Sequence, residues 1–250
     1  MGNLKGKIAL ITGASRGLGK GIALALAEQG ADIVINYHSN STEAEITKAK
    51  IEYLGRKAIL IQADVSDKAD VDRMFEQIKE DYGCLDILVN NAGTTKSQDI
   101  FETELEDWDF IIKTNLSSVF LCSKAAMKIM KQQQSGRIIN ISSIVGERGA
   151  LYGHVHYAST KSGMFGFTKT LARTAAPLGI TVNCIAPGII ETELLFKTHG
   201  EAEVTKLAKN VPLGLGKTKD IGLAVAFLAG DGGRYITGTT IDVNGGMYLR

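Results

Sequence analysis

Two side chains that could move a proton stand four residues apart in this sequence. Tyr157 and Lys161 bound the segment YASTK, and residues at i and i+4 of a helix are neighbours. A lysine ammonium beside a phenol favours the phenolate and lowers the tyrosine pKa from about 10. Such a tyrosine could donate and accept a proton near neutral pH. The YxxxK spacing alone is common, so this interpretation needs support from other residues.

A serine supplies part of that support. The apolar run Ile138–Ile141 reads as a strand and continues into Ser142 and Ser143. Ligands of open α/β sheets bind beyond the carboxyl ends of the strands. We therefore expect the hydroxyl of Ser143 to lie at that edge of the sheet.

A glycine-rich turn near the N-terminus could bind phosphate. Thr12–Gly19 reads TGASRGLG, directly after the apolar run IALIT and directly before a segment with helical spacing. Glycines permit a tight turn and a close approach of backbone N–H groups to a pyrophosphate, and the helix N-terminus adds partial positive charge. A strand before and a helix after the turn strengthen this interpretation over a glycine-rich turn without a ligand.

The residues after the second strand favour NADP over NAD. NAD sites usually carry an acidic residue there for the ribose 2′-hydroxyl, but Asn36–Ser39 contains none. Arg16 lies inside the glycine-rich turn, and a guanidinium suits a 2′-phosphate. Alternatively, Arg16 is a solvated loop charge and the site takes either cofactor. His38 is a second phosphate contact or simply a surface histidine.

The elements that must position these residues alternate along the whole chain. Short apolar runs are followed by longer segments with helical spacing, several of which stop at a glycine. This order predicts a single α/β domain over residues 1–250, a doubly wound parallel sheet of about seven strands with helices on both faces. The expected strands are Ile8–Thr12, Ile33–Asn36, Ala58–Ala63, Ile87–Asn90, Arg137–Ile141, Thr181–Ile185 and Thr239–Val243, and the expected helices include Leu18–Gln29, Thr42–Leu54, Val71–Tyr82, Leu105–Gln134 and Tyr157–Ala176.

The segment Glu191–Leu215 has no strand pattern. It carries the apolar cluster Leu194, Leu195 and Phe196 beside charged residues. Such a cluster suits a lid that is exposed when open and buried over substrate when closed. The alternative is a rigid helical hairpin packed on the sheet.

Composition excludes several classes of protein. The 250 residues are 44% hydrophobic with a formal net charge of +1, which argues against nucleic-acid binding. No long apolar stretch predicts a membrane span or a signal peptide. The three cysteines are far apart in the sequence and favour a reducing, cytoplasmic location. His154 and His156 lack further ligands at suitable spacing, so we expect no metal site.

Together these motifs resemble the short-chain dehydrogenase/reductase family over nearly all 250 residues. The matching pieces are TGASRGLG at Thr12–Gly19, NNAG at Asn90–Gly93, Asn115, Ser143, YASTK at Tyr157–Lys161, and APG followed by Thr192. The resemblance implies an NADP(H)-dependent oxidoreductase, with NAD possible, that interconverts a carbonyl and a secondary alcohol of a small molecule.

The resemblance also implies a role for each residue. Tyr157 would exchange the proton with the substrate oxygen, Lys161 would lower its pKa and hold the nicotinamide ribose, and Ser143 would hydrogen-bond the substrate oxygen. Asn115 would fix a water that links Lys161 to solvent. Asn90 would either contact the cofactor or tie neighbouring strands together. Besides Tyr157 and Lys161, the implied cofactor-binding residues are Gly13, Ser15, Arg16, Gly17, Leu18, Gly19, Asp64, Val65, Asn91, Ala92, Gly93, Pro187, Gly188, Ile190 and Thr192.

Within the family, the sequence is most similar to the bacterial 3-oxoacyl-acyl-carrier-protein reductases. Two departures affect the carrier protein. Gln134 and Leu178 occupy places where those reductases often carry basic residues, and the stretch between Ser143 and Tyr157 is one residue longer. That stretch borders the substrate and contains Arg148, Tyr152, His154 and His156. A sugar, polyol or hydroxysteroid dehydrogenase, or a cofactor sensor without turnover, are the alternatives.

The two long helices predict an oligomer. Leu105–Gln134 and Tyr157–Ala176 carry small and apolar residues around their circumference. One sheet face cannot cover a helix on all sides, so a partner subunit should cover the rest. By resemblance, we expect a homotetramer.

Overall fold

A parallel sheet of seven strands forms the centre of the computed structural model, which describes residues 4–151 and 153–249. Its strand order is β3-β2-β1-β4-β5-β6-β9, and every neighbouring pair is parallel. The strands are β1 (Ile8–Ile11), β2 (Asp32–Tyr37), β3 (Ala58–Gln62), β4 (Ile87–Asn90), β5 (Gly136–Ile141), β6 (Ile180–Pro187) and β9 (Thr240–Val243). The order reverses between β1 and β4, which confirms the predicted doubly wound sheet.

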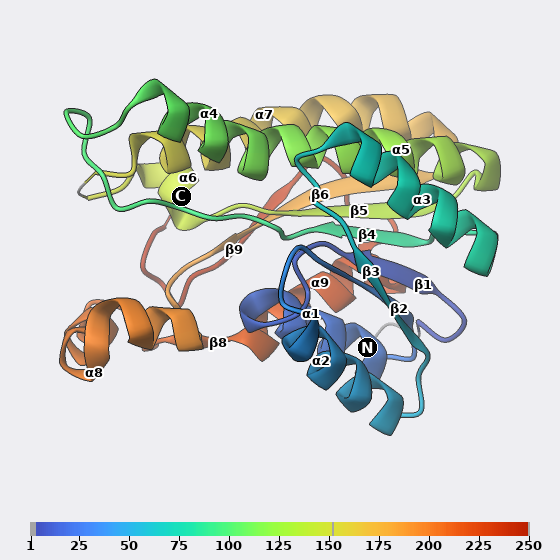
Figure 1. Ribbon diagram of the computed structural model, residues 1–250, viewed down its shortest axis with the longest axis horizontal. Helices are drawn as coiled ribbons and strands as arrows, with labels where there is room; N and C mark the ends of the chain where they lie inside the picture. The colour runs from blue at the N-terminus through green and yellow to red at the C-terminus, as the bar shows by residue number, and fades with distance from the viewer. Residues whose placement is uncertain (1–3, 152, 250) are drawn as a thin grey trace.

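Helices cover both faces of the sheet (Figure 1). On one face lie α1 (Gly17–Glu28), α2 (Ser41–Tyr53) and α9 (Thr218–Ala229), and on the other lie α3 (Lys68–Tyr82), α5 (Ser118–Gln133) and α7 (Val155–Ala175). In β1, Ala9 and Ile11 pack toward the first layer, whereas Ile8 and Leu10 pack toward the second. This burial on both sides explains why the strands read as continuous apolar runs.

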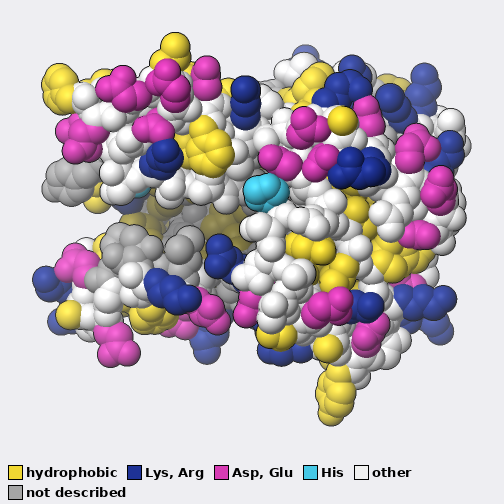
Figure 2. All heavy atoms as spheres, in the orientation of Figure 1, with side chains coloured by type: hydrophobic (Ala, Val, Ile, Leu, Met, Phe, Trp, Pro, Cys, Tyr) yellow, Lys and Arg dark blue, Asp and Glu magenta, His cyan; other side chains and the backbone are white. Residues whose placement is uncertain are grey.

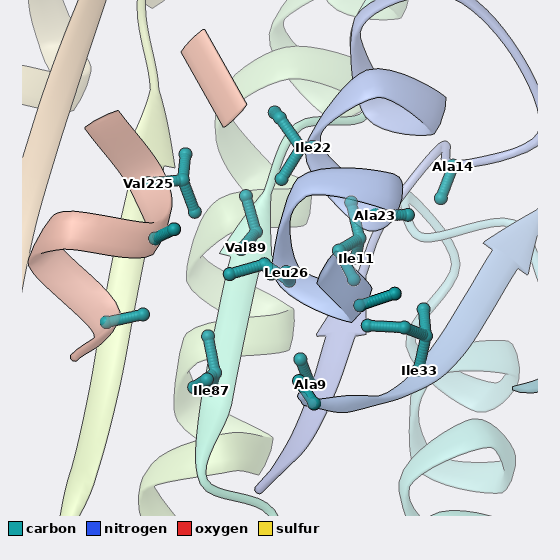
Figure 3. Close-up of a cluster of buried hydrophobic side chains, with 14 of the residues drawn as sticks. Ala9, Ile11, Ala14, Ile22, Ala23, Leu26, Ile33, Ile87, Val89 and Val225 are labelled. Atoms are coloured by element: carbon teal, nitrogen blue, oxygen red, sulfur yellow. The ribbon is translucent and has the colours of Figure 1, made fainter. Parts of the chain in front are cut away.

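The first layer has a tightly packed core (Figure 3). Ile22 and Leu26 of α1 belong to one buried cluster with Val89 of β4 and Val225 of α9. The two helices approach closely because α9 has a glycine at the contact: a Cβ atom on Gly222 would lie 2.5 Å from the Cβ atom of Ala25. This packing holds α1 against α9 and the sheet.

The expected helix Leu105–Gln134 is interrupted. It consists of α4 (Leu105–Ile112), a π-helical turn at Lys113–Ser117 and α5. A π turn adds one residue to a helical turn and is frequent at functional sites. Periodicity misses it because the apolar pattern continues across the insertion.

The segment after β6 also differs from the prediction. The prediction that residues 191–215 contain no strand is wrong at its first residue. Glu191 belongs to the two-residue strand β7 (Ile190–Glu191), which pairs in parallel with β8 (Gly216–Lys217). Between them lies α8 (Glu193–Lys209), kinked at Gly200, whose φ is 70°. The sequence also gave no indication of the short helix α6 (Ile144–Arg148). None of the helices in the described ranges combines the length and apolar character needed to cross a membrane.

Candidate active site at the carboxyl edge of the sheet

The predicted site residues gather at the edge where the parallel strands end. Ser143 follows β5, Lys161 lies in α7, and the glycine-rich turn follows β1. On this side the molecule is hollowed between the layer of α4 and α6 and the separate helix α8, and hydrophobic side chains are visible in the hollow (Figure 2). The sheet edge therefore brings together residues that are more than 140 positions apart in the sequence.

Ser143 and Tyr157 form a hydrogen-bonded pair. Ser143 is the N-cap residue of α6, and its Oγ accepts a hydrogen bond from the backbone N–H of Val145 at 3.1 Å. The phenol of Tyr157 shares a hydrogen bond with the Ser143 side chain. Because the cap fixes the serine, the pair presents two hydroxyl groups in a defined arrangement that could bind one substrate oxygen.

The expected lowering of the Tyr157 pKa is wrong for this structure. Burial raises the pKa of Tyr157, and the hydrogen bond with Ser143 opposes that rise. Desolvation disfavours the phenolate, so Tyr157 keeps its proton at neutral pH. A protonated phenol suits a proton donor during reduction of a carbonyl.

Lys161 lies buried beneath the tyrosine. Its side chain is 4% exposed, and its Nζ lies 5.5 Å from the centroid of the Tyr157 ring. Nζ donates a hydrogen bond to the carbonyl oxygen of Ile141 at 2.9 Å. Burial lowers the pKa of Lys161 from 10.5 to about 8. The ammonium is therefore held at the end of β5 and can lose its proton in mildly alkaline solution.

Asn115 occupies the π turn and is fully buried. Its Oδ1 accepts a hydrogen bond from the backbone N–H of Thr94, and its Nδ2 donates one to the Thr94 carbonyl oxygen, both at 2.8 Å. The side chain thus fixes the segment that follows β4. Its role toward a water molecule stays a prediction.

The glycine-rich turn has the geometry of an anion cradle. Gly13 and Gly17 have φ values of 64° and 56°, which favour glycine. A Cβ atom on Gly19 would lie 2.4 Å from the carbonyl oxygen of Gly13. The first turn of α1 has no acidic residue and no side-chain cap, so its N–H groups can receive a phosphate. These residues fit a dinucleotide cofactor.

The NNAG segment is tied to this turn. Thr12 Oγ1 accepts hydrogen bonds from the backbone N–H groups of Asn91 and Ala92, each at 3.0 Å. Asn91 Nδ2 donates to the Thr12 carbonyl oxygen at 2.9 Å. Gly93 lies close to two other site residues, because a Cβ atom there would be 3.3 Å from Asn115 Oδ1 and 3.7 Å from Lys161 Nζ. Asn91, Ala92 and Gly93 therefore link the cradle to the Tyr157 region.

Asn90 has a structural role. It is 3% exposed, and its Nδ2 donates hydrogen bonds to Asn140 Oδ1 at 2.8 Å and to Ser123 Oγ at 3.0 Å. These contacts join β4 to β5 and α5. Of the two interpretations from sequence, the contacts favour the one in which Asn90 ties neighbouring strands together.

The residues expected around the adenosine end of the cofactor follow β1 and the edge strand β3. Arg16 is exposed directly before α1, beside Ser15, Gly17 and Leu18. Asp64 and Val65 follow β3, and Asp64 Oδ1 accepts hydrogen bonds from the backbone N–H and the hydroxyl of Ser66. His38 Nε2 lies 3.9 Å from Asp64 Oδ2, which gives this histidine a carboxylate partner.

The last group of expected cofactor residues follows β6. Pro187 ends β6, and Gly188 donates its N–H to the Val243 carbonyl oxygen at 3.0 Å. Ile190 lies in β7, and Thr192 caps α8 by accepting a hydrogen bond from the N–H of Leu195 at 3.2 Å. Thr192 therefore fixes the start of α8 next to the sheet edge. Tyr152 and the side chain of Leu194 lie outside the described part of the chain.

Two residues that shape the cradle were missed from sequence. Asn36 Oδ1 accepts from the N–H of Gly13 at 3.2 Å, and its Nδ2 donates to the Ala63 carbonyl oxygen at 3.1 Å. Thr47 Oγ1 donates to the Ser15 carbonyl oxygen at 2.7 Å. Asn36 stands out as a polar residue within the apolar second strand, and that contrast could have identified it. Thr47 gives no comparable signal in its helix.

Comparison with known proteins agrees with this geometry. A family model described as "Enoyl-(Acyl carrier protein) reductase" matches residues 13–248. A 3-oxoacyl-[acyl-carrier-protein] reductase, FabG, from Escherichia coli (strain K12) is 46% identical over 248 residues, which cover 99% of both chains. FabG from Haemophilus influenzae is 45% identical over 98% of this chain and all of the relative. A solved structure of a putative short-chain alcohol dehydrogenase from Sinorhizobium meliloti 1021 superposes with a TM-score of 0.92 at 37% identity, covering 98% and 97% of the two chains.

The chain belongs to the short-chain dehydrogenase/reductase family. It is an NAD(P)-dependent oxidoreductase that acts on carbonyl and CH–OH groups. Within the family it is a 3-oxoacyl-acyl-carrier-protein-reductase-like enzyme, similar to those reductases from end to end.

Proposed function

We propose that the protein reduces the 3-oxo group of an acyl substrate to a 3-hydroxy group with NADPH. The observation that carries this proposal is the pairing of Ser143 with a protonated Tyr157 above the buried Lys161. Two hydroxyl groups that bind one oxygen suit a carbonyl. The similarity to 3-oxoacyl reductases over 99% of the chain supports the substrate class.

In this mechanism the bound cofactor supplies a hydride to the carbonyl carbon. Ser143 and Tyr157 hold the carbonyl oxygen, and Tyr157 transfers its phenolic proton to that oxygen as the negative charge develops there. Lys161, held by Ile141, stabilises the resulting phenolate because opposite charges attract strongly in a buried site. Solvent then returns a proton to Tyr157.

We propose NADP rather than NAD as the cofactor. Arg16 is exposed beside the cradle, and the residues after β2 include no carboxylate to bind a 2′-hydroxyl. A guanidinium there would favour the extra phosphate of NADP.

A second candidate is a free polyol, sugar or steroid substrate, with the reaction running toward oxidation. Gln134 and Leu178 are neutral where the carrier-protein reductases often have basic residues. The two segments lie side by side, because a Cβ atom on Gly179 would be 2.3 Å from the Gln134 carbonyl oxygen. An acidic carrier protein would find no charge at either residue, which favours a small free substrate.

We further propose a homotetramer in the cytoplasm. Phe120, Met127, Phe167 and Leu171 line an apolar groove between α5 and α7 on the face away from the sheet. A partner subunit would bury this surface. The three free cysteines support a reducing compartment. Light scattering should give about four times the 26.8 kDa chain mass at micromolar concentration, and a monomeric mass would contradict the proposal.

Residues 191–215 are proposed as a substrate lid within one oxidoreductase domain. The segment is bounded by the paired strands β7 and β8, and α8 is kinked at Gly200. Phe196 is 40% exposed on this helix. Movement of α8 over the hollow would bury such side chains and exclude water from the reacting groups.

The test of function is the Tyr157→Phe variant. It keeps the ring and removes only the exchangeable proton, so reduction of a 3-oxoacyl thioester should slow by about 10²–10⁴-fold while NADPH binding persists. Turnover is followed by NADPH oxidation, with acetoacetyl groups on a small thiol and on acyl carrier protein compared side by side. Near-full activity of the variant would refute the assigned chemistry. Oxidation of polyols without reduction of either thioester would favour the second candidate.

A further inference from the structure

His156 precedes the proton donor in the chain, and its imidazole is bonded to the donor's backbone. It is the second residue of α7 and is fully buried. Its Nδ1 accepts a hydrogen bond from the backbone N–H of Tyr157 at 2.7 Å. The first N–H groups of a helix have no intrahelical acceptor, and His154 at the N-cap provides no side-chain cap. The imidazole of His156 supplies the missing acceptor for the Tyr157 N–H.

This hydrogen bond requires a neutral imidazole. A ring nitrogen that accepts a hydrogen bond carries no proton, so the neutral ring holds its proton on Nε2. In the described part of the chain, Nε2 of His156 is buried without a hydrogen-bond partner. After protonation Nδ1 would also carry a hydrogen, and two N–H groups would face each other. A positive charge would also lie near the N-terminus of a helix, where the dipole disfavours it.

The surroundings keep His156 neutral. Three charged or titratable groups act on the ring: His154 at the start of α7, Asp107 in α4, and Lys96 in the segment between β4 and α4. Burial lowers the pKa of His156, His154 and Lys96 lower it further, and Asp107 opposes them. The carboxylate of Asp107 already accepts hydrogen bonds from Lys96 Nζ and from Gln98 Nε2.

The segment between β4 and α4, which contains Lys96 and Gln98, also contacts the start of α7. The carbonyl oxygen of Gln98 accepts a hydrogen bond from the N–H of His154 at 2.7 Å. His154 Nδ1 lies 3.0 Å from Thr95 Oγ1, and His154 has a left-handed backbone with φ of 60°. The first turn of α7 is thus attached to this segment at His154, whereas the hydrogen bond at the Tyr157 N–H lies within the turn itself. Only the bond within the turn depends on the protonation of His156.

We propose that neutral His156 is a positioning residue: its ring fixes the backbone of Tyr157, and protonation of the ring releases it and slows reduction. The inference rests on the proposed role of Tyr157. Reduction needs a protonated Tyr157 and a charged Lys161, and acid favours both forms. A loss of reduction rate in acid would therefore come from another group, and the hydrogen bond between His156 and the Tyr157 N–H assigns it to His156.

The test compares kcat at saturating NADPH from about pH 5 to 8, with ethyl acetoacetate as the probe, in the wild type, His156→Asn and His156→Phe. Asn places an uncharged acceptor, Oδ1, as many bonds from Cα as Nδ1 is. Phe fills the space but offers no acceptor. We expect kcat of the wild type to fall in acid, and His156→Asn to keep a kcat within about threefold at neutral pH without that fall. His156→Phe should lose about tenfold in kcat at every pH, the equivalent of one hydrogen bond, with little change in KM for NADPH.

A second readout needs no turnover. Nitrogen NMR of the His156 ring at neutral pH should show an unprotonated Nδ1 and a protonated Nε2, and the opposite tautomer would overturn the proposal. His154→Gln is the matched control, because it removes the other imidazole of the same turn and should retain the fall in acid. The proposal would also be overturned if kcat of the wild type did not fall in acid, or if kcat of His156→Asn fell as much as that of the wild type.

Failure of this inference can be told apart from failure of the proposed function. If Tyr157→Phe remains active, the assignment of the proton donor is wrong. If Tyr157→Phe is inactive and His156→Asn still loses activity in acid, only the role of His156 is wrong. Thermal denaturation and NADPH binding check that each variant folds, and if His156→Phe does not, the pH profile of His156→Asn and the ring tautomer decide.

Discussion

Replacing Lys161 by Met should make the protein more stable and inactive. Burial lowers the pKa of Lys161 from 10.5 to about 8, and each pKa unit corresponds to about 1.4 kcal/mol. Keeping the ammonium in the native protein therefore costs about 3 kcal/mol at pH 7 relative to a neutral side chain. The hydrogen bond from Nζ to Ile141 returns about 1 kcal/mol, which leaves a net gain for Lys161→Met of about 2 kcal/mol. For a chain of this length the melting temperature should rise by about 4–8 °C.

The gain should depend on pH in a defined direction. The native pKa lies below the unfolded one, so the unfolded state binds more protons between pH 8 and 10.5. Across that window the wild type becomes more stable as pH rises, and the destabilisation caused by Lys161 fades. At pH 9 the cost of the charge falls to about 2 kcal/mol, so the advantage of Met shrinks by about 1 kcal/mol.

The assay is thermal denaturation at pH 7 and pH 9, at one protein concentration, beside NADPH-dependent turnover. Lys169→Met is the matched control, because Lys169 is exposed on the same helix and should change stability little. A Lys161→Met protein that is less stable than the wild type at pH 7, or whose advantage does not change with pH, would refute the reasoning. Retained turnover would contradict the proposed role of the ammonium.

Three further predictions concern the cofactor, the sheet and α8. Arg16→Ala should weaken NADPH by about 1.5–3 kcal/mol and NADH much less, because it removes a charge-assisted contact; equal weakening in a binding titration would contradict the NADP assignment. Asn90→Ala should lower the free energy of unfolding by about 1–3 kcal/mol, because buried partners lose their hydrogen bonds, and a variant that instead lost NADPH affinity at unchanged stability would restore a cofactor role. Hydrogen exchange in residues 191–215 should slow when NADPH and a substrate analogue bind. Slow exchange in the free protein, unchanged on binding, would exclude a lid.

The sequence by itself determined the fold class and supplied most residues of the candidate site. Strands buried on both faces must read as apolar runs, and a phosphate cradle needs its glycines closely spaced in the turn that directly follows a strand. Tyr157 and Lys161 share a helix, so their spacing alone makes them neighbours. These signals come from residues that are close together in the chain, so the sequence alone reveals them.

The tertiary structure decided what depends on residues far apart in the chain. Asn36 could be connected to Gly13 only when β1 and β2 were paired, and the π turn at Asn115 packs against α7, as α4 does. The direction of the Tyr157 pKa shift was wrong from sequence, because spacing reveals the neighbouring ammonium but not the burial. Desolvation depends on all the atoms packed around a group, and here it raises the pKa of Tyr157 although a lysine lies one helical turn away.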